Sequence, residues 1–370
     1  MLISEERFLT DISISNYFFK TGVLFVGNEF LGNANFFALA ECPIYFFGNT
    51  VRGSFILQGK YENGIVLSNS LFEGGVFSAN STLNQIIAEN AIFKKWVSFS
   101  GANIAHVTFD GSSFLSSLDF SGDMALNDNK PQTIGRANFR GVSFGGPVDF
   151  SNRKFLHSTQ FSVQPETRKQ TIFAQAPQFY NSELHQNTSF DSAVFNSPSS
   201  VDSSEARAYS TLRHAMSKVQ ANRDEHRFLA LELDAERAFD KNATSILYRL
   251  YRMFSGYGFS LRRPIILLIV VPTLLAFLIY GVATALWNCE GLSSLQCGID
   301  PSLFSRLLAF TLLHSLPPLG IDKLIDGNIH SLFADEQMRS VLPVIVFQKI
   351  ATLGGWFFIA LGLRNLFRMK

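Results

Sequence analysis

The stretch VDFSNRKFLHSTQF (148–161) places Phe150, Phe155 and Phe161 in steps of five and then six residues. An α-helix would repeat its apolar side chains every three or four residues, and a two-faced strand every two. Neither element can therefore keep these three rings on one side. A helical coil of backbone can, if five or six residues form one side of each coil and the central ring points to the coil axis.

The same spacing continues through the middle of the chain, and phenylalanine outnumbers tyrosine and tryptophan by 38 to 9 and 3. Small and turn-forming residues, chiefly Ser, Gly, Asn and Ala, separate the rings, as the corners of such a coil require. We therefore predict a solenoid with a core of stacked rings. The predicted core consists of Phe99, Phe109, Phe114, Phe120, Phe139, Phe144, Phe150, Phe155, Phe161, Phe173, Phe179, Phe190 and Phe195.

On these residues the chain resembles the pentapeptide-repeat family, particularly its variant with a double unit of the type VDFSxxxF. The resemblance implies a β-solenoid, a right-handed quadrilateral β-helix, over 20–196. With about 20 to 22 residues per coil it implies roughly eight coils, stacked about 4.8 Å apart like neighbouring strands. A solenoid end exposes an unpaired strand edge, so residues 1–19 are predicted to form an N-terminal cap.

Two polar segments interrupt the apolar spacing. MALNDNKPQTIG (124–135) is predicted to be a surface loop extruded between coils, with a recognition loop as the alternative. SPSSVDSS (197–204) is predicted to be a linker. After it, apolar residues recur at helical spacing, and 205–255 is predicted to form a cytosolic helical hairpin and a juxtamembrane helix.

Two apolar segments near the end of the chain predict membrane spans. The segment 264–287 contains no charged residue and is long enough as a helix to cross a bilayer core. The second, 341–366, contains Gln348 and Lys349. Basic residues lie at the outer ends of both segments, whereas 288–340 holds six acidic and three basic residues. The positive-inside rule therefore predicts an inner-membrane protein with two spans and with both the N-terminus and the C-terminus in the cytosol.

The segment between the spans is predicted to be extracytoplasmic. Its apolar part, 302–316, is too short to cross the bilayer twice, so we predict a short re-entrant or interfacial helix. Cys289 and Cys297 would then lie on the oxidising side, where a disulfide between them and two free thiols are both open alternatives.

This plan is similar to that of bacterial proteins that join pentapeptide repeats, a helical hairpin and a two-span, ion-channel-like module. The similarity lies in YRLYRMFSGYGFSLRRP (248–264) and ALGLRNLFRMK (360–370). Potassium channels carry a TVGYG-like filter after the pore helix. This chain has SLPPLGID (315–322) instead, so potassium selectivity by the usual carbonyl ladder is not supported.

Six residues are candidates for pore lining or gating: Lys349, Gln348, His314, Arg306, Pro317 and Pro318. A charge inside a span is costly, so Lys349 should face protein or water, unless its stem reaches the outer interface. Gln348 could instead bond across helices. His314 could respond to pH or could simply be hydrogen-bonded. The two prolines break the short helix.

Other classes of function have no support in the sequence. We find no nucleophile elbow, no zinc-protease motif and no clustered metal ligands, so we predict no catalytic residue, no metal, no cofactor and no enzyme. Acidic and basic residues are nearly balanced between 20 and 196, which disfavours a DNA mimic and nucleic-acid binding.

Three hypotheses remain for the function. The first is a sensing or docking rod that controls a channel-like module in the lipid bilayer. Two spans cannot enclose water, so this requires a homo-oligomer, by analogy a tetramer. The second is a membrane-anchored scaffold without conductance, whose rod binds a protein partner. The third is a membrane-perturbing effector of stress or phage defence.

Overall fold

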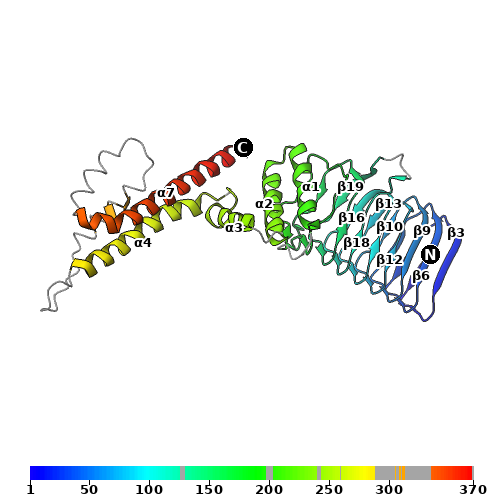
Figure 1. Cartoon of the computed structure of the whole chain (residues 1–370). Helices are drawn as coiled ribbons and strands as arrows, with labels where there is room; N and C mark the ends of the chain where they lie inside the picture. The colour runs from blue at the N-terminus through cyan, green and yellow to red at the C-terminus, as the bar shows by residue number, and fades with distance from the viewer. Residues whose placement is uncertain are drawn as a thin grey trace. The chain divides into compact units, whose positions relative to one another are not determined.

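The chain is described by a computed structural model of residues 1–125, 130–196, 203–239, 243–258, 260–287 and 335–368, with a few positions (305, 308–309 and 311–312) before the last range. It divides into two units, Met1–Lys241 and Asn242–Lys370. Figure 1 shows stacked strands and a helical hairpin in the first unit and long helices in the second.

The first unit begins with a β-solenoid whose strands form four parallel ladders, one for each side of the coil. The second ladder is the simplest, and it contains nine strands. These strands are β2 (Arg7–Phe8), β5 (Glu29–Phe30), β8 (Thr50–Val51), β11 (Leu71–Phe72), β14 (Ile92–Phe93), β17 (Ser113–Phe114), β20 (Ser143–Phe144), β24 (Ile172–Phe173) and β25 (Val194–Phe195). The solenoid therefore has about nine coils.

The other three ladders share several longer strands, which bend from one side of the coil to the next. The first ladder contains β1 (Leu2–Ser4), β4 (Val23–Val26), β7 (Ile44–Phe47), β10 (Ile65–Val66), β23 (Thr159–Gln160) and the ends of β13 (Thr82–Ile87), β16 (Asn103–Thr108) and β19 (Gln132–Asn138). The third contains the starts of β3 (Ile12–Phe19), β6 (Ala34–Ala40) and β9 (Phe55–Tyr61), followed by β12 (Val76–Phe77), β15 (Val97–Ser98), β18 (Leu118–Asp119) and β21 (Val148–Asp149). The fourth joins the ends of β3, β6 and β9 to the starts of β13, β16 and β19 and to β22 (Arg153–Phe155).

The first coil is built like the others. Leu2 pairs with Leu24, and Leu24 pairs with Tyr45, so partners in successive coils lie 22 or 21 residues apart. Residues 1–19, which were predicted to form a cap, contain strands β1, β2 and β3 and make up this first coil; a role of that coil as the cap stays a prediction. Pairing of this sort is made by backbone groups, so it does not need the phenylalanine spacing that is missing from this stretch.

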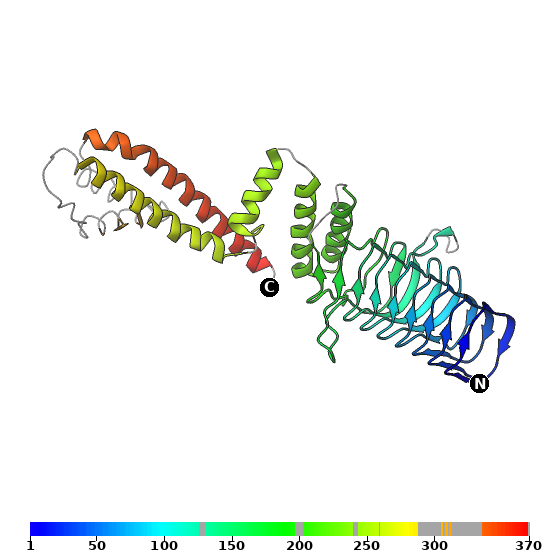
Figure 2. The same cartoon turned by 90° about the horizontal axis from the view of Figure 1, so that it is seen from below.

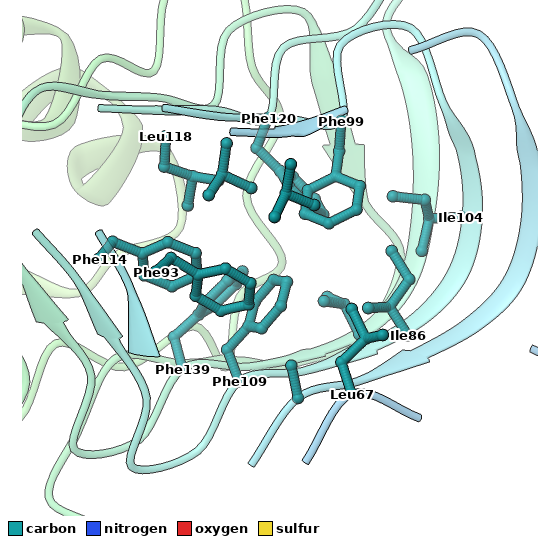
Figure 3. Close-up of a cluster of buried hydrophobic side chains, with 14 of the residues drawn as sticks. Leu67, Ile86, Phe93, Phe99, Ile104, Phe109, Phe114, Leu118, Phe120 and Phe139 are labelled. Atoms are coloured by element: carbon teal, nitrogen blue, oxygen red, sulfur yellow. The ribbon is translucent and has the colours of Figure 1, made fainter. Parts of the chain in front are cut away.

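The core of the solenoid is a column of stacked rings, as Figure 3 shows for its middle coils. The rings of Phe93 and Phe114 stack with centroids 4.7 Å apart, and those of Phe139 and Phe161 with centroids 5.0 Å apart. All of the predicted core rings are buried except Phe195, which is partly buried. Burying one such side chain stabilises the fold by about 1.5–3 kcal/mol.

One corner of the coil shows why glycine and asparagine recur between the rings. Gly48, Asn69, Asn90 and Gly111 follow one another at this corner in successive coils, and all four have positive φ angles, between 55° and 73°. Glycine adopts this left-handed conformation without strain, and asparagine tolerates it better than most other residues, so these two residues recur at the corner.

The coil length changes at two insertions. Ile104 pairs with Ile134, 30 residues later, and Ser143 pairs with Ile172, 29 residues later. The first insertion corresponds to the loop predicted at 124–135, but its last residues, from Gln132 on, belong to β19. Residues 126–129 lie outside the described part of the chain.

Arg153 is an unexpected member of the core, because its charged side chain is fully buried. The guanidinium group donates hydrogen bonds to the carbonyl oxygens of Ala102 (2.7 Å), Phe120 (2.9 Å), Ser121 (2.9 Å) and Phe99 (3.2 Å). Burial lowers the pKa of Arg153 to about 10. The side chain thus ties its own coil to two earlier coils through their backbone.

The last coil is covered by a helical hairpin formed by α1 (Ser204–Lys218) and α2 (Asn222–Phe239). The buried ring of Phe228 lies 5.2 Å from Phe190 and 5.4 Å from Phe195, measured between centroids. Arg227 donates hydrogen bonds to the carbonyl oxygens of Phe190 (3.0 Å) and Ala193. The hairpin therefore caps the C-terminal end of the solenoid, where it covers both the apolar bore and open carbonyl groups.

The second unit contains α3 (Ala243–Ser255), α4 (Arg262–Trp287) and α7 (Asp335–Arg368). Helices α4 and α7 lie side by side, and α3 lies beside the start of α4 and the later part of α7 (Figure 2). The rings of Tyr251 in α3 and Phe358 in α7 stack with centroids 6.0 Å apart.

Candidate functional site

Both α4 and α7 carry large apolar side chains that are exposed in the described part of the chain. They are Ile265, Ile266, Ile269, Val270, Leu274, Phe277 and Leu278 in α4, and Val346, Phe347, Ile350, Leu353, Phe357 and Leu363 in α7. A contiguous apolar surface of this kind marks contact with a membrane or with another protein.

One helix in the described part of the chain is long and apolar enough to cross a membrane. The stretch Val346–Arg364 of α7 has 19 residues and a mean hydropathy of 1.5. It overlaps the second predicted span, 341–366. In α4 the side chains of 279–287 lie outside the described residues, so the first predicted span, 264–287, stays a prediction.

Glycines bring α7 close to its neighbours. A Cβ atom on Gly355 would lie 2.8 Å from Cδ2 of Leu268 in α4, and one on Gly362 would lie 2.6 Å from Cδ2 of Leu261. Gly354, by contrast, has no other group within 4 Å of the place where its Cβ would lie. Small residues at such positions allow apolar helices to pack by close backbone approach, as they do inside membranes.

Gln348 lies on the inner side of α7 and is buried. Its Nε2 donates a hydrogen bond of 2.5 Å to the carbonyl oxygen of Thr311, in the segment between α4 and α7. Thr352, one turn further along α7, donates to the carbonyl oxygen of Gln348 at 2.6 Å. This geometry corresponds to the structural alternative for Gln348, a bond that joins two segments.

Lys349 follows Gln348 directly, about 100° further around α7, and is exposed. Val346, three residues before it, and Leu353, four residues after it, are both exposed and apolar. Residues three or four apart share one face of a helix, so the ammonium group extends from an otherwise apolar surface. A role of Lys349 in a pore or in gating stays a prediction.

The remaining candidate residues fall outside the described part of the chain. These are Arg306, His314, Pro317 and Pro318, together with the possible disulfide partners Cys289 and Cys297. The predicted short helix at 302–316 is described at only five positions, 305, 308–309 and 311–312, and these are helical.

A cleft of about 650 Å³ lies in the first unit, between the last coils and α1. Its wall on the solenoid side includes Tyr180 and Glu183, and its wall on α1 includes His214 and Lys218. Glu183 pairs with Lys154 at 2.6 Å. Sequence reasoning missed this cleft, because the solenoid and α1 contribute to it from positions about 30 residues apart and no local motif connects them.

Comparison of the chain with protein-family models, with curated proteins and with solved structures found no match. Among the residues that the structure describes, no three His, Cys, Asp or Glu side chains come together in a way that could hold a metal ion. The candidate site is therefore the apolar helix pair, with one buried amide and one outward ammonium group on α7.

Proposed function

We propose that this chain is an inner-membrane protein of the pentapeptide-repeat type, in which a right-handed quadrilateral β-helix is a cytosolic sensing or docking rod. The rod controls a two-span, oligomeric, channel-like module made by α4 and α7. Support comes from the exposed apolar side chains of both helices and from the close approach of Gly355 in α7 to Leu268 in α4. The resemblance of 248–264 and 360–370 to two-span channel-like proteins points in the same direction.

The observation that carries this proposal is the outward position of Lys349. A charged side chain that faces lipid at the bilayer centre costs about 2.5–3.5 kcal/mol on insertion scales. Further copies of α7 packed around a water-filled path would remove that cost, because Lys349 would then face water. Two helices of a single copy cannot enclose such a path, so the proposal requires an oligomer, by analogy a tetramer.

The test is ion flux through purified protein in lipid vesicles. Rings of lysine side chains favour anions over cations. We expect the wild-type protein to conduct, Lys349→Met to lower its preference for anions, and Lys349→Arg to keep it. The same samples are sized in detergent. A protein that is a single copy and does not conduct contradicts the pore proposal.

A second candidate function, a membrane-anchored scaffold without conductance, is favoured by the cleft between the last coils and α1. That cleft is open to solvent and combines the exposed ring of Tyr180 with His214 and Lys218, so it suits recognition of a partner or ligand without any pore. The scaffold predicts single copies that stay in the membrane fraction and carry no current.

A further inference from the structure

Helix α3 presents an apolar side that no described part of the second unit covers. Ile246, Leu250 and Met253 are 60%, 39% and 55% exposed. Their spacing of four and then three residues places them on one face of the helix. Three large apolar side chains on one exposed helix face need a covering partner.

An adjacent side of α3 contacts α7. The ring of Tyr251 lies 6.0 Å from Phe358 of α7, and that of Phe254 lies 6.4 Å from the same ring, measured between centroids. Tyr251 also contacts Tyr257 edge to face at 5.5 Å. These contacts hold α3 against the helix pair and leave Ile246, Leu250 and Met253 exposed.

The surroundings of α3 are strongly basic. The chain has no acidic residue from 241 to 289, and Arg249, Arg262 and Arg263 are exposed. None of these three arginines forms an ion pair with a carboxylate among the described residues. Arg263 donates a hydrogen bond of 2.6 Å to the carbonyl oxygen of Arg252, which holds the start of α4 against α3.

A further arginine reaches the same place from α7. Burial raises the pKa of the Tyr251 hydroxyl, and the nearby positive charge of Arg364 opposes that rise. Basic residues from α3, the start of α4 and the end of α7 thus meet at one end of the helix pair. An apolar helix face beside several cations is typical of helices that lie in the surface of an anionic membrane.

We propose that α3 is a lipid-binding interfacial helix. Ile246, Leu250 and Met253 enter the boundary between headgroups and acyl chains, and the surrounding arginines bind the phosphate groups of anionic lipids. This inference rests on the proposed membrane insertion of α4 and α7. Helix α4 begins only seven residues after α3 ends, so an inserted α4 would hold α3 at the bilayer surface.

Lipid fits this face better than a second copy of the chain. A second copy would bring the same excess of positive charge to the same place, because like charges at 241–289 would meet without an acidic residue between them. Anionic headgroups complement the charge, and the acyl region covers the apolar side chains.

The test is amide hydrogen exchange of 246–254 in full-length protein in lipid nanodiscs. One set contains phosphatidylcholine alone, and the other contains phosphatidylglycerol as well. Each arginine near an anionic surface contributes about fivefold in affinity. We therefore expect phosphatidylglycerol to slow the exchange of α3, and the double variant Arg249→Gln with Arg262→Gln to remove most of that slowing.

A control is Arg223→Gln, which removes a positive charge from an exposed position on α2, in the other unit. It should leave the effect of phosphatidylglycerol on α3 unchanged.

Three outcomes would contradict the proposal. If the protein enters the nanodiscs and α3 exchanges at the same rate in both lipid mixtures, this inference alone is overturned. Protection that depends on protein concentration and not on lipid charge also overturns it, in favour of a second copy. Protein that never enters the bilayer overturns the proposed function as well.

Discussion

Phenylalanine side chains form the buried core of the solenoid, whereas two of those in α7 are exposed. In the solenoid, phenylalanines such as Phe72, Phe109 and Phe139 are fully buried. In α7, Phe347 and Phe357 are exposed, and Phe357 has 62% of its surface exposed. The solenoid therefore contains its own core, whereas the helix pair needs surroundings that are themselves apolar.

The largest difference should appear when one ring is removed from each region. Phe139→Ala should lower the free energy of unfolding of the solenoid by about 3–5 kcal/mol, because it leaves a cavity in a packed column. Phe357→Ala should change it by less than about 0.5 kcal/mol, since that ring is exposed and belongs to the other unit. Chemical unfolding of the detergent-solubilised chain, followed by circular dichroism, measures both. Equal losses would contradict the contrast between the two regions.

A smaller effect is expected at the buried charge of the solenoid. Arg153→Met should cost about 2–4 kcal/mol, because several carbonyl oxygens in the core lose their donor and cannot reach water. The adjacent Lys154 is exposed and pairs with Glu183 at the surface, so Lys154→Met should cost less than about 1 kcal/mol. A neutral result for Arg153→Met in the same unfolding assay would show that methionine packs as well as the hydrogen-bonded guanidinium group.

Two adjacent glycines test the packing of the helix pair. Gly355→Leu should lower its stability by about 1–3 kcal/mol, because the new side chain would overlap Leu268. Gly354→Leu adds the same atoms to open space and should leave the pair intact. Unfolding of the reconstituted helices by added sodium dodecyl sulfate separates the two outcomes. Similar destabilisation by both variants would argue that a further copy of the chain covers Gly354.

The smallest effect concerns ion pairs on the solenoid surface. Arg52 lies 2.6 Å from Glu29, and both side chains are partly in water. Arg52→Gln should lower the free energy of unfolding by less than about 1 kcal/mol, and high salt should reduce the difference further. A loss as large as that of Arg153→Met would mean that surface charges, and not the buried column, set the stability of the coils.

The phenylalanine spacing predicted the solenoid well because it is repeated many times. Phenylalanine recurs every five or six residues over most of the stretch from Phe99 to Phe190. A single exception such as Ile104 therefore does not hide the pattern. The end structures were harder to predict. The stretch ISISNYFF (12–19) pairs through its backbone with β6, and Arg227 finds its carbonyl partners more than 30 residues away. Neither relation leaves a local pattern in the sequence.

The candidate site was predicted only in part for a related reason. Gln348 and Lys349 are neighbours, and successive residues on a helix point about 100° apart. The sequence could name both as polar interruptions of a span, but it could not say which one turns inward. The contacts of α7 with its neighbours decide this, and they bury the amide and leave the ammonium group exposed.

The amino-acid sequence by itself determined the length of one coil side, the residues of its core and the apolar character of the two long helices. These are properties of spacing and composition, which act over a few neighbouring residues. Only the tertiary structure decided that the first nineteen residues form a coil, that α1 and α2 form the cap, and that Arg153 lies inside. Each of these depends on hydrogen bonds and packing between residues about 20 to 50 positions apart. A pattern of neighbouring residues in the sequence does not show which of these distant residues will be in contact.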